Sequence, residues 1–354
     1  MNATSIPVIV LGGSGYVAGE FLRLIAQHPR LHLGAAVSTS AAGEQIGTAF
    51  AHLVPSYAEQ CFVSIDTAIA QLSDAQRWVA VSAAPHGASA ALIERILSSA
   101  ESAAVDVTAV DASADFRFRS AAEYEAIYST PHGAPARLES FRCAVPEHLA
   151  EIDTPHMAQP GCFASAMLLA AVPLVAKGLT EPDFCVSAIT GSTGAGGTPR
   201  ETTHHPVRQS NLFAYQPLVH RHVPEVRTLT EAATGQSIGL HFVPHSGPFA
   251  RGIHATVFAP RATSASADEI RAAVADYYRD SRFVHVLDAP PRLKDIVGTN
   301  YANLSVSADD GTVSVCCVID NLVKGAAGGA MQWVNRLLGW PDTEGLEATS
   351  PGWI

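Results

Sequence analysis

Two kinds of segment alternate along the first 150 residues. Short apolar runs bounded by turn residues predict strands at 6–11, 31–37, 78–81 and 105–110. Between them lie stretches with helical character, of which 20–27 is amphipathic and 88–97 is the clearest of the others. Strands that alternate with helices are typical of an α/β domain, in which helices cover a parallel sheet.

The pattern changes near residue 150. Pro160 and Gly161 precede a long apolar stretch that predicts a helix over 163–177. Strand-like runs then follow without regular helices between them, at 184–189, 239–244, 253–258 and 312–319. This order indicates a second, α+β domain with a largely antiparallel sheet. The stretch from 191 to 224 is rich in Gly, Thr, His and Pro, which is typical of a long functional loop.

Composition and charge narrow the classes of protein. Of the 354 residues, 47% are hydrophobic and 16% charged, which excludes a disordered chain. The formal charge is −11 and no run of Lys or Arg occurs, so we expect neither a nucleic acid nor an anionic membrane as partner. The N-terminus lacks a basic signal region and the six cysteines form no C-x-x-C pair, which favours a cytoplasmic protein.

A glycine-rich turn follows the first predicted strand. Gly13-x-Gly15-x-x-Ala18 fits the dinucleotide fingerprint, in which glycines let the backbone approach a pyrophosphate at a helix N-terminus. The alternative is a plain turn of an α/β domain. The fingerprint predicts a Rossmann-type domain, and its candidate cofactor-binding residues are Gly12, Gly13, Ser14, Gly15, Tyr16 and Val17.

The end of the second predicted strand bears on the choice of cofactor. An NAD site usually carries an acidic residue there, which binds the ribose 2′-hydroxyl. This chain has hydroxyl side chains instead, with Ser38 and Ser40 as candidates and no carboxylate between them. Hydroxyls tolerate a 2′-phosphate, so we expect NADP(H).

One cysteine, Cys162, stands at the start of the long apolar helix. A free thiol with a pKa near 8.5 is only slightly ionised at pH 7, and a helix dipole lowers that pKa by about one unit at most. A nearby imidazolium would be needed to populate the thiolate. From position alone, Cys162 is either a nucleophile or a core residue.

Six histidines between residues 204 and 245 could supply that imidazole. The densest run is His220-Arg221-His222-Val223-Pro224-Glu225, in which Glu225 could orient an imidazole ring. A zinc site and a solvated His-rich loop are the alternatives. No H-E-x-x-H and no cysteine pair is present, so we expect no metal.

Eight motifs occur in order along almost the whole chain. They are GGSGYVAGEFLRLIAQHP (12–29), PHG (85–87), DASADFRF (111–118), PGCFAS (160–165), GSTGAGG (191–197), HRHVPE (220–225), HFVPHSGPFARGIHAT (241–256) and DNLVKGAAGGAMQ (320–332). Together they resemble the N-acetyl-gamma-glutamyl-phosphate reductase family, relatives of aspartate-semialdehyde dehydrogenase.

The resemblance implies NADPH-dependent reduction of an acyl phosphate, N-acetyl-gamma-glutamyl phosphate, to a semialdehyde in arginine biosynthesis. Cys162 would form a thioester as phosphate leaves, and a histidine would act as acid and base. We prefer His222 for this role, with His220 as the alternative. By the same resemblance Asn321 and the turn after it return the last helix to the nucleotide domain. The predicted domains are therefore 1–160 with 321–354, and 161–320 for substrate and dimerisation.

Further candidates follow from the ligands. We expect three further residues to contact the cofactor: Pro85 in the PHG motif, and Ser192 and Gly194 in the glycine-rich loop. The substrate carries a phosphate and at least one carboxylate, groups that arginine binds bidentately. The arginines in or beside the motifs are Arg117, Arg251 and Arg208.

The identity of the acyl group stays open. The family loop resembles S-G-A-G-R, whereas here 193–197 is TGAGG. The segments around 203–206 and 211–218 look more like the branch that acts on acyl phosphates held on an amino-group carrier protein. An N-succinyl or carrier-linked substrate is therefore an alternative. Different classes would be a metal-dependent hydrolase or a redox-sensing dinucleotide-binding protein. We expect a homodimer or homotetramer.

Overall fold

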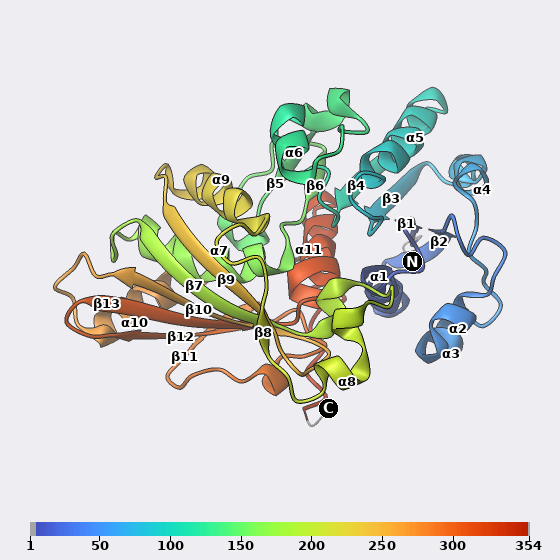
Figure 1. Cartoon of the computed structure of the whole chain (residues 1–354). Helices are drawn as coiled ribbons and strands as arrows, with labels where there is room; N and C mark the ends of the chain where they lie inside the picture. Colours follow the sequence, from blue (N-terminus) through green and yellow to red (C-terminus); the bar gives the residue numbers. More distant parts are fainter. Residues whose placement is uncertain (1–4, 353–354) are drawn as a thin grey trace. The chain divides into compact units, whose positions relative to one another are not determined.

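The computed structural model describes residues 5–352, which form two compact units (Figure 1). Unit 1 comprises the described residues up to Ala144, then Glu151–Gln159 and Ala327–Glu347. Unit 2 comprises Val145–Ala150, Pro160–Ala326 and the described residues from Ala348. The chain thus crosses from unit 1 to unit 2 beside Pro160 and returns at Ala327.

Unit 1 is built on a six-stranded sheet in which every pairing is parallel. The strand order is β2-β1-β3-β4-β6-β5. This order reverses direction between β1 and β3, which is where doubly wound sheets bind ligands at the carboxyl ends of their strands. The strands are β1 (Ile6–Leu11), β2 (Leu31–Val37), β3 (Arg77–Ser82), β4 (Asp106–Asp111), β5 (Phe141–Cys143) and β6 (His156–Ala158).

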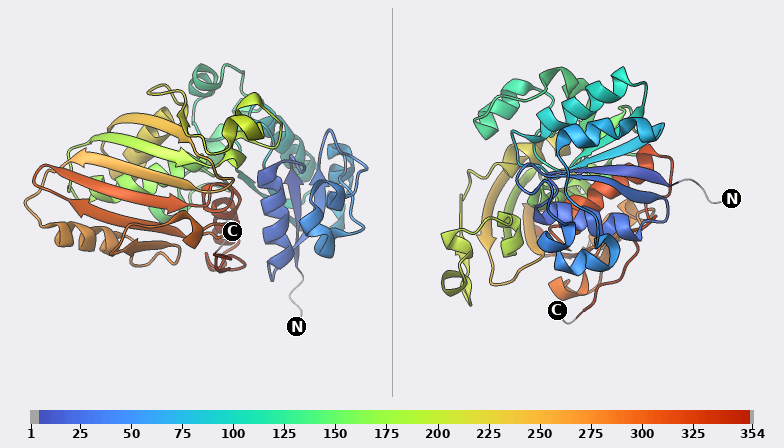
Figure 2. Two further views of the ribbon diagram at one scale, coloured as in Figure 1. Left: turned by 60° about the horizontal axis from the view of Figure 1, so that its bottom comes forward. Right: turned by 90° about the vertical axis from the view of Figure 1, so that its right-hand side faces the viewer.

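Helices cover both faces of this sheet. The right view of Figure 2 shows α4 and α5 on one side and α1 and α11 on the other. The helices of unit 1 are α1 (Tyr16–Gln27), α2 (Ile46–Ala49), α3 (Val54–Tyr57), α4 (Ile65–Ala70), α5 (Ser89–Ser102), α6 (Ala121–Tyr128) and α11 (Gly328–Leu337). Short 3₁₀ turns span Ala51–Leu53, Leu72–Asp74 and Pro135–Ser140. The predicted α/β Rossmann-type domain is confirmed.

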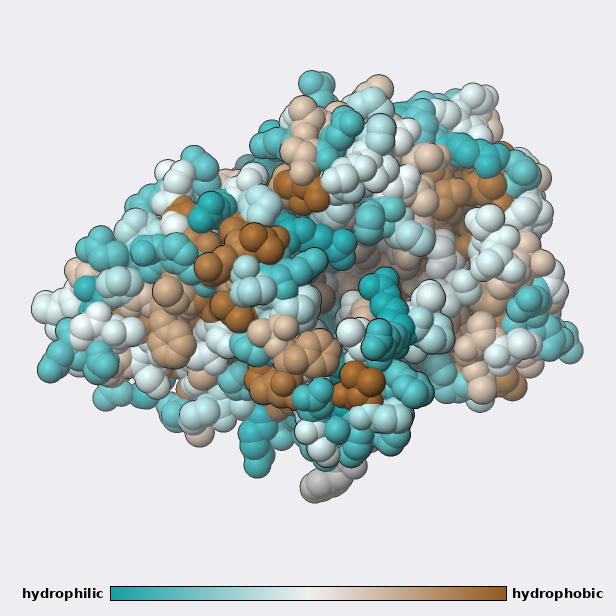
Figure 3. Space-filling model, in the orientation of Figure 1, coloured by the Kyte–Doolittle hydropathy of each residue, from teal (hydrophilic) through white to brown (hydrophobic). Residues whose placement is uncertain are grey.

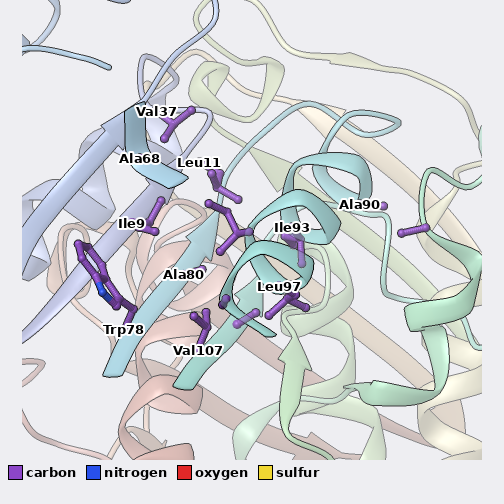
Figure 4. Packing of buried hydrophobic residues seen from close by; sticks show 14 of the residues in the cluster. Ile9, Leu11, Val37, Ala68, Trp78, Ala80, Ala90, Ile93, Leu97 and Val107 are labelled. Carbon is purple, nitrogen blue, oxygen red and sulfur yellow. The ribbon is translucent and has the colours of Figure 1, made fainter. Parts of the chain in front are cut away.

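The core of unit 1 explains why the apolar runs become strands. Ile9, Trp78 and Val107 come from β1, β3 and β4, and their side chains pack with Ile93 and Leu97 of α5 (Figure 4). All five are at most 8% exposed. Strands buried on both faces are near-continuously apolar, which is the pattern the sequence has here.

Unit 2 contains a seven-stranded mixed sheet with the order β11-β12-β13-β10-β7-β9-β8. Four of its six pairings are antiparallel, and β11–β12 and β7–β9 are parallel. The prediction of a largely antiparallel sheet is confirmed. The strands are β7 (Asp183–Thr190), β8 (Phe213–Ala214), β9 (Gly239–Ser246), β10 (Ile253–Pro260), β11 (Val284–Leu287), β12 (Ala302–Ala308) and β13 (Thr312–Ile319).

The central helix of unit 2 is α7 (Cys162–Ala176), which packs on β10 and β13. Every residue from Phe163 to Val175 is buried, as expected for a helix that is apolar all round. The other helices are α8 (His205–Arg208), α9 (His222–Thr234) and α10 (Ala267–Tyr277). Short 3₁₀ turns span Pro146–His148, Ser192–Ala195, Glu201–Thr203 and Leu293–Asp295, and one turn of π-helix spans Val323–Ala327.

One face of the unit 2 sheet is covered by helices and the other is open. Along β7, Phe184 and Val186 are buried whereas Cys185 and Ser187 are exposed. Phe258 of β10 pairs with Cys185 and is 42% exposed on the same open face. Figure 3 shows apolar groups among hydrophilic ones over the strands of this unit. Within residues 5–352, no helix is both long and apolar enough to cross a membrane.

Candidate active site

The glycine-rich turn of unit 1 follows β1 and leads into α1. Gly12 has a φ of +77°, and a Cβ placed on it would lie 2.5 Å from the Ala84 main chain. The Gly13 N–H donates to the Val37 carbonyl at 2.7 Å. The turn therefore lies against the residues that follow β2 and β3, and Gly12 is the residue type that this approach requires.

The other predicted cofactor residues of unit 1 lie at the same edge of the sheet. The hydroxyls of Ser14 and Ser38 are 3.3 Å apart. Ser38 is buried and its hydroxyl accepts the Ala41 N–H, whereas Ser40 is exposed. Pro85 follows β3 and accepts the Ala88 N–H through its carbonyl. The carboxyl ends of three adjacent strands thus bring these residues together.

The α1 N-terminus fits an anionic dinucleotide. Gly15 is the N-cap residue, no side chain caps the helix, and no acidic residue lies in its first turn. Tyr16, the first helical residue, is 44% exposed. An uncapped helix N-terminus behind a glycine turn binds a pyrophosphate through main-chain N–H groups. The residues present therefore fit the phosphates of NADP(H).

Two buried carboxylates of the DASADFRF motif support this edge. Asp115 accepts the N–H groups of Gly87 and Ala90, each at 2.9 Å, and so holds the PHG turn at the start of α5. Asp111 accepts the Ser89 hydroxyl at 2.7 Å. Burial, and then the nearby Asp115 charge, raises the pKa of Asp111 to about 6. Neither role was predicted from the sequence.

Arg117 also belongs to unit 1. Its Nε donates to the Gln159 carbonyl at 3.2 Å. Gln159 is 1% exposed and its own N–H donates to the Asp111 carbonyl at 2.8 Å. Arg117 therefore lies beside the last residue of unit 1 before the chain enters unit 2.

In unit 2, Cys162 is the first residue of α7 and is partly exposed. The preceding Gly161 is the N-cap residue, and no side chain caps the helix in the usual way. Instead the Gly161 N–H donates at 2.6 Å to Oε1 of Glu225, a residue of α9 with no exposed surface. The predicted nucleophile and the predicted carboxylate are thus brought together, and Glu225 fixes the residue before Cys162.

His220 and His222 lie in the same cluster. Their ring centroids are 4.7 Å apart, and both rings pack against Phe163, the residue after Cys162. The His222 N–H donates to Nδ1 of His220 at 3.2 Å, so Nδ1 acts as an acceptor. Burial, and then the Arg221 charge, lowers the pKa of His220 to about 4. His220 is therefore a neutral ring at pH 7.

The sequence did not predict Tyr215. Its ring centroid lies 5.8 Å from that of His220. Burial, and then the negative charge of Cys162, raises the pKa of Tyr215, so its phenol stays protonated. A protonated phenol can donate a hydrogen bond. The only signal for Tyr215 in the sequence is its position five residues before His220. It lies in the segment 211–218, which we had considered only for its similarity to one branch of the family.

Ser192, Gly194 and Asn321 meet in a network of loops. The Asn321 amide donates to the Thr193 hydroxyl at 3.0 Å, and its oxygen accepts the Gly252 N–H at 2.7 Å. The Ser192 N–H donates to the Phe249 carbonyl at 2.9 Å. A Cβ on Gly194 would lie 4.0 Å from the Asn321 amide nitrogen. Segments far apart in sequence thus form one hydrogen-bonded loop cluster.

The two predicted arginines of unit 2 have defined partners there. Arg251 donates through Nε and Nη2, each at 3.0 Å, to the two oxygens of buried Asp320. Arg208 is 8% exposed, and it donates to the Ser246 hydroxyl at 2.7 Å and to the carbonyls of Gly247 and Phe249. Both side chains therefore organise the loops beside the cluster. Within residues 5–352 no group of three or more His, Cys, Asp or Glu is arranged to hold a metal ion.

Comparisons with known proteins agree with this geometry. Residues 7–159 match the family model for the NAD binding domain of semialdehyde dehydrogenase, and residues 162–321 match that for its dimerisation domain. Solved structures with the same fold include aspartate semialdehyde dehydrogenase II of Vibrio cholerae complexed with ASA, with a TM-score of 0.69, 17% identity and coverage of 95% of this chain and 98% of the other. Aspartate semialdehyde dehydrogenase of Candida albicans with NADP has a TM-score of 0.61 at 14% identity, covering 95% and 99%.

Curated relatives are more similar in sequence. An N-acetyl-gamma-glutamyl-phosphate reductase of Acidothermus cellulolyticus is 39% identical over 96% of this chain and 97% of its own. That of Methanopyrus kandleri is 37% identical over 98% and 99%, and that of Desulforudis audaxviator is 36% identical over 96% and 98%. With both domains matched and these relatives aligned over nearly their whole length, the chain belongs to the N-acetyl-gamma-glutamyl-phosphate reductase family, a branch of the semialdehyde dehydrogenases.

Proposed function

We propose that this protein is an NADPH-dependent reductase that converts N-acetyl-gamma-glutamyl phosphate to the semialdehyde with release of phosphate, in cytoplasmic arginine biosynthesis. The curated relatives carry the name of this activity. The observation that carries the proposal is Cys162 at the start of α7, with two buried histidines against the next residue.

Cys162 is the nucleophile. Its thiolate attacks the acyl carbon, the bond from that carbon to the phosphate oxygen breaks, and a thioester remains on the enzyme. Main-chain N–H groups in the first turn of α7 stabilise the oxyanion that forms during the attack. The Gly161 N–H is already held by Glu225, so the donors of this turn are fixed in direction before substrate binds.

Proton transfer is assigned to His222. Its neighbour His220 accepts a main-chain N–H through Nδ1 and has a pKa lowered to about 4 by burial, so it stays neutral. His220 then orients its neighbour, while His222 takes the proton of the thiol and returns one to the leaving group. The protonated phenol of Tyr215 supplies a further hydrogen-bond donor near the sulfur.

NADPH, when bound, would supply a hydride to the thioester carbon. The bond from that carbon to the Cys162 sulfur then breaks, which releases the semialdehyde and regenerates the thiolate. In unit 1 the turn at Gly12–Val17 would hold its pyrophosphate, Ser38 and Ser40 would bind the ribose phosphate, and Pro85 would contribute from the same edge of the sheet. In unit 2 the loop cluster of Ser192, Gly194 and Asn321 contributes main-chain groups. The acyl-phosphate substrate is held by arginines, with Arg117 and Arg251 as first candidates. Arg251 is oriented by its two hydrogen bonds to Asp320, and Arg208 holds the neighbouring loop.

A homodimer is the simplest assembly, with a homotetramer as the larger alternative. The open face of the unit 2 sheet, which carries Phe258 and Cys185, is the surface that we assign to a second copy. The matched model is described as a dimerisation domain.

Replacing the exposed Phe258 by Glu should yield monomers in light scattering, whereas Val54→Glu, at similar exposure in unit 1, should not. An unchanged mass for Phe258→Glu would contradict this assignment.

The reaction is tested most simply in reverse. Semialdehyde, phosphate and NADP⁺ are mixed with the wild type, with Cys162→Ser, and with Cys61→Ser as a control at an exposed thiol of unit 1. We expect Cys162→Ser to lose at least about 10³-fold in kcat and the control to lose nothing. Full activity of Cys162→Ser would reject the proposal. Substrates with N-acetyl, N-succinyl and carrier-linked groups decide which acyl group the enzyme accepts, and a requirement for the carrier would identify the amino-group carrier protein as its partner.

A further inference from the structure

The π-helical turn Val323–Ala327 packs directly on the nucleophile. A Cβ placed on Gly325 would lie 2.8 Å from Cβ and 3.0 Å from Cα of Cys162. It would also lie 3.3 Å from Cδ1 of Ile319. Real Cβ atoms do not approach other atoms at less than about 3 Å, because the repulsion is then steep. Cα and Cβ of Cys162 therefore leave room for a hydrogen atom at this position of Gly325 but not for a methyl group.

The first three residues of this turn are held by two sets of contacts, so the part that faces Cys162 cannot easily move away. The Gly325 N–H donates to the Asp320 carbonyl at 3.0 Å. The Asp320 carboxylate accepts the N–H groups of Leu322 and Val323 at 2.8 and 2.9 Å and is also bound by Arg251.

The neighbouring Lys324 provides the second anchor. Its ammonium group lies 2.6 Å from the Glu147 carboxylate, and both side chains are at most 2% exposed. Breaking a buried ion pair is costly, because it leaves the other charge uncompensated. An additional carbon at Gly325 must therefore be accommodated by displacing Cys162 rather than the turn.

We propose that Gly325 is a positioning residue for Cys162, because the absence of its Cβ sets how closely the π-turn approaches the nucleophile and so where the sulfur points. This inference rests on the proposed role of Cys162 as the nucleophile. Gly325 has an ordinary φ, so its requirement for glycine comes from this contact and not from the backbone conformation. Displacing a reacting atom by about 1 Å costs about 10²-fold in rate.

The catalytic test compares Gly325→Ala with Gly311→Ala, a glycine of the same unit whose Cβ would meet no atom within 4 Å. We expect kcat to fall about 10- to 100-fold in Gly325→Ala, with the KM and the NADPH affinity within about twofold of the wild type. The pH profile of Cys162 alkylation by iodoacetamide should also shift. Gly311→Ala should match the wild type in all four quantities. A folded Gly325→Ala with an unchanged kcat or an unchanged alkylation profile would overturn the proposal.

A stability cycle tests the contact itself without using activity. Cys162→Gly removes the nearest carbon, whereas Cys162→Ser keeps it. Cys162→Gly should therefore restore part of the Tm, or of the soluble folded state, that Gly325→Ala loses, because only the contact with Cα remains, and Cys162→Ser should not. The proposal would be overturned if Ile319→Val, and not Cys162→Gly, restored the stability of Gly325→Ala. It would also be overturned if neither substitution restored that stability. Full activity of Cys162→Ser would reject the proposed function, whereas an inactive Cys162→Ser beside a fully active Gly325→Ala would reject only this inference.

Discussion

Two helix N-termini carry the chemistry of this molecule, and they are built in different ways. At α1 in unit 1 no side chain caps the helix and its first turn holds no acidic residue, so it is open to the phosphates of a dinucleotide. At α7 in unit 2, Glu225 holds the Gly161 N–H and the main chain of Gly325 lies against Cys162. The first terminus is open to the diffusible anion that we propose there, whereas the second is closed around the proposed nucleophile.

The difference lies in what holds each terminus. The turn before α1 is positioned by main-chain contacts to the two neighbouring strands of its own sheet, such as Gly13 to Val37. The residues around Cys162 are positioned by ion pairs, namely the buried Lys324–Glu147 pair and the pair of partly exposed Arg251 with buried Asp320. Charged groups far from one another in sequence can orient a thiolate, but their stability depends on every partner being present.

The largest effect on stability is expected from Lys324→Met, which leaves the Glu147 carboxylate buried without its cation. We expect a loss of about 3–5 kcal/mol, and a smaller loss in the double variant Glu147→Gln with Lys324→Met. Denaturation followed by far-UV circular dichroism reports on both units. Tryptophan fluorescence reports mainly on unit 1, which holds Trp78, Trp333 and Trp340.

In Lys324→Met, unit 2 should unfold at a lower denaturant concentration than unit 1. The unfolding transition followed by dichroism should therefore split in two, whereas the transition followed by fluorescence should stay nearly unchanged. A loss of less than about 1 kcal/mol would show that the residues around Cys162 do not depend on this ion pair, and the contrast between the two termini would weaken.

A second comparison separates two glycines of the nucleotide turn. Gly12→Ala should lower both the Tm and the affinity for NADPH, because its φ is positive and its Cβ would meet the Ala84 main chain. At Gly15 the nearest atom to an added Cβ is 3.8 Å away, so Gly15→Ala should fold normally. It should still weaken NADPH binding about tenfold or more, since the pyrophosphate approaches the backbone there.

Calorimetric titration with NADPH and thermal melting measure both effects. Equal loss of Tm in the two variants would contradict the structure of the turn. Unchanged binding by Gly15→Ala would contradict the placement of the pyrophosphate at the α1 N-terminus.

A smaller effect is expected from pH. Burial lowers the pKa of His148 in unit 2 to about 4 from its ordinary 6.5. Between these two values the unfolded chain binds a proton that the folded chain does not, so the contribution of His148 to stability is lost as the pH falls from about 6.5 toward 4. Asp111 of unit 1, with its pKa raised to about 6, contributes in the opposite direction over the same range.

The Tm of unit 2 should therefore fall by several degrees between pH 7 and 5. It is measured from the part of the dichroism transition that tryptophan fluorescence does not report. His148→Gln should reduce that fall, because glutamine binds no proton and can still form a hydrogen bond to the Tyr278 hydroxyl. An equal fall in wild type and variant would assign the acid sensitivity to other groups.

The sequence predicted those features whose cause is local. The alternation of apolar runs and periodic stretches located β1 to β4 of the parallel sheet but not the three-residue strands β5 and β6. The fingerprint located the start of α1 to within a few residues. Cys162 was placed beside a helix start because Gly161 and the apolar run adjoin it. Strands such as β12 (Ala302–Ala308) were missed, since the alternation in ANLSVSA includes only two large apolar residues, Leu304 and Val306.

The features that the sequence could not predict are contacts between distant segments. Gly161 and Glu225 are 64 residues apart, and the contact of Gly325 with Cys162 spans a still longer separation. Nothing in either local pattern indicates that an acidic side chain will hold a helix start or that a glycine will face a thiol. Arg251 illustrates the same point. Its residue type suggested an anionic substrate, and the structure places one edge of its guanidinium on Asp320.

The proposed reaction depends most on the covalent role of Cys162. Semialdehyde and NADP⁺ mixed with enzyme in the absence of phosphate should give a burst of one NADPH for each active site. Mass spectrometry should then find one acyl group on the peptide that carries Cys162, and added phosphate should remove it. Turnover without a burst, or an acyl group on any other residue, would contradict the account.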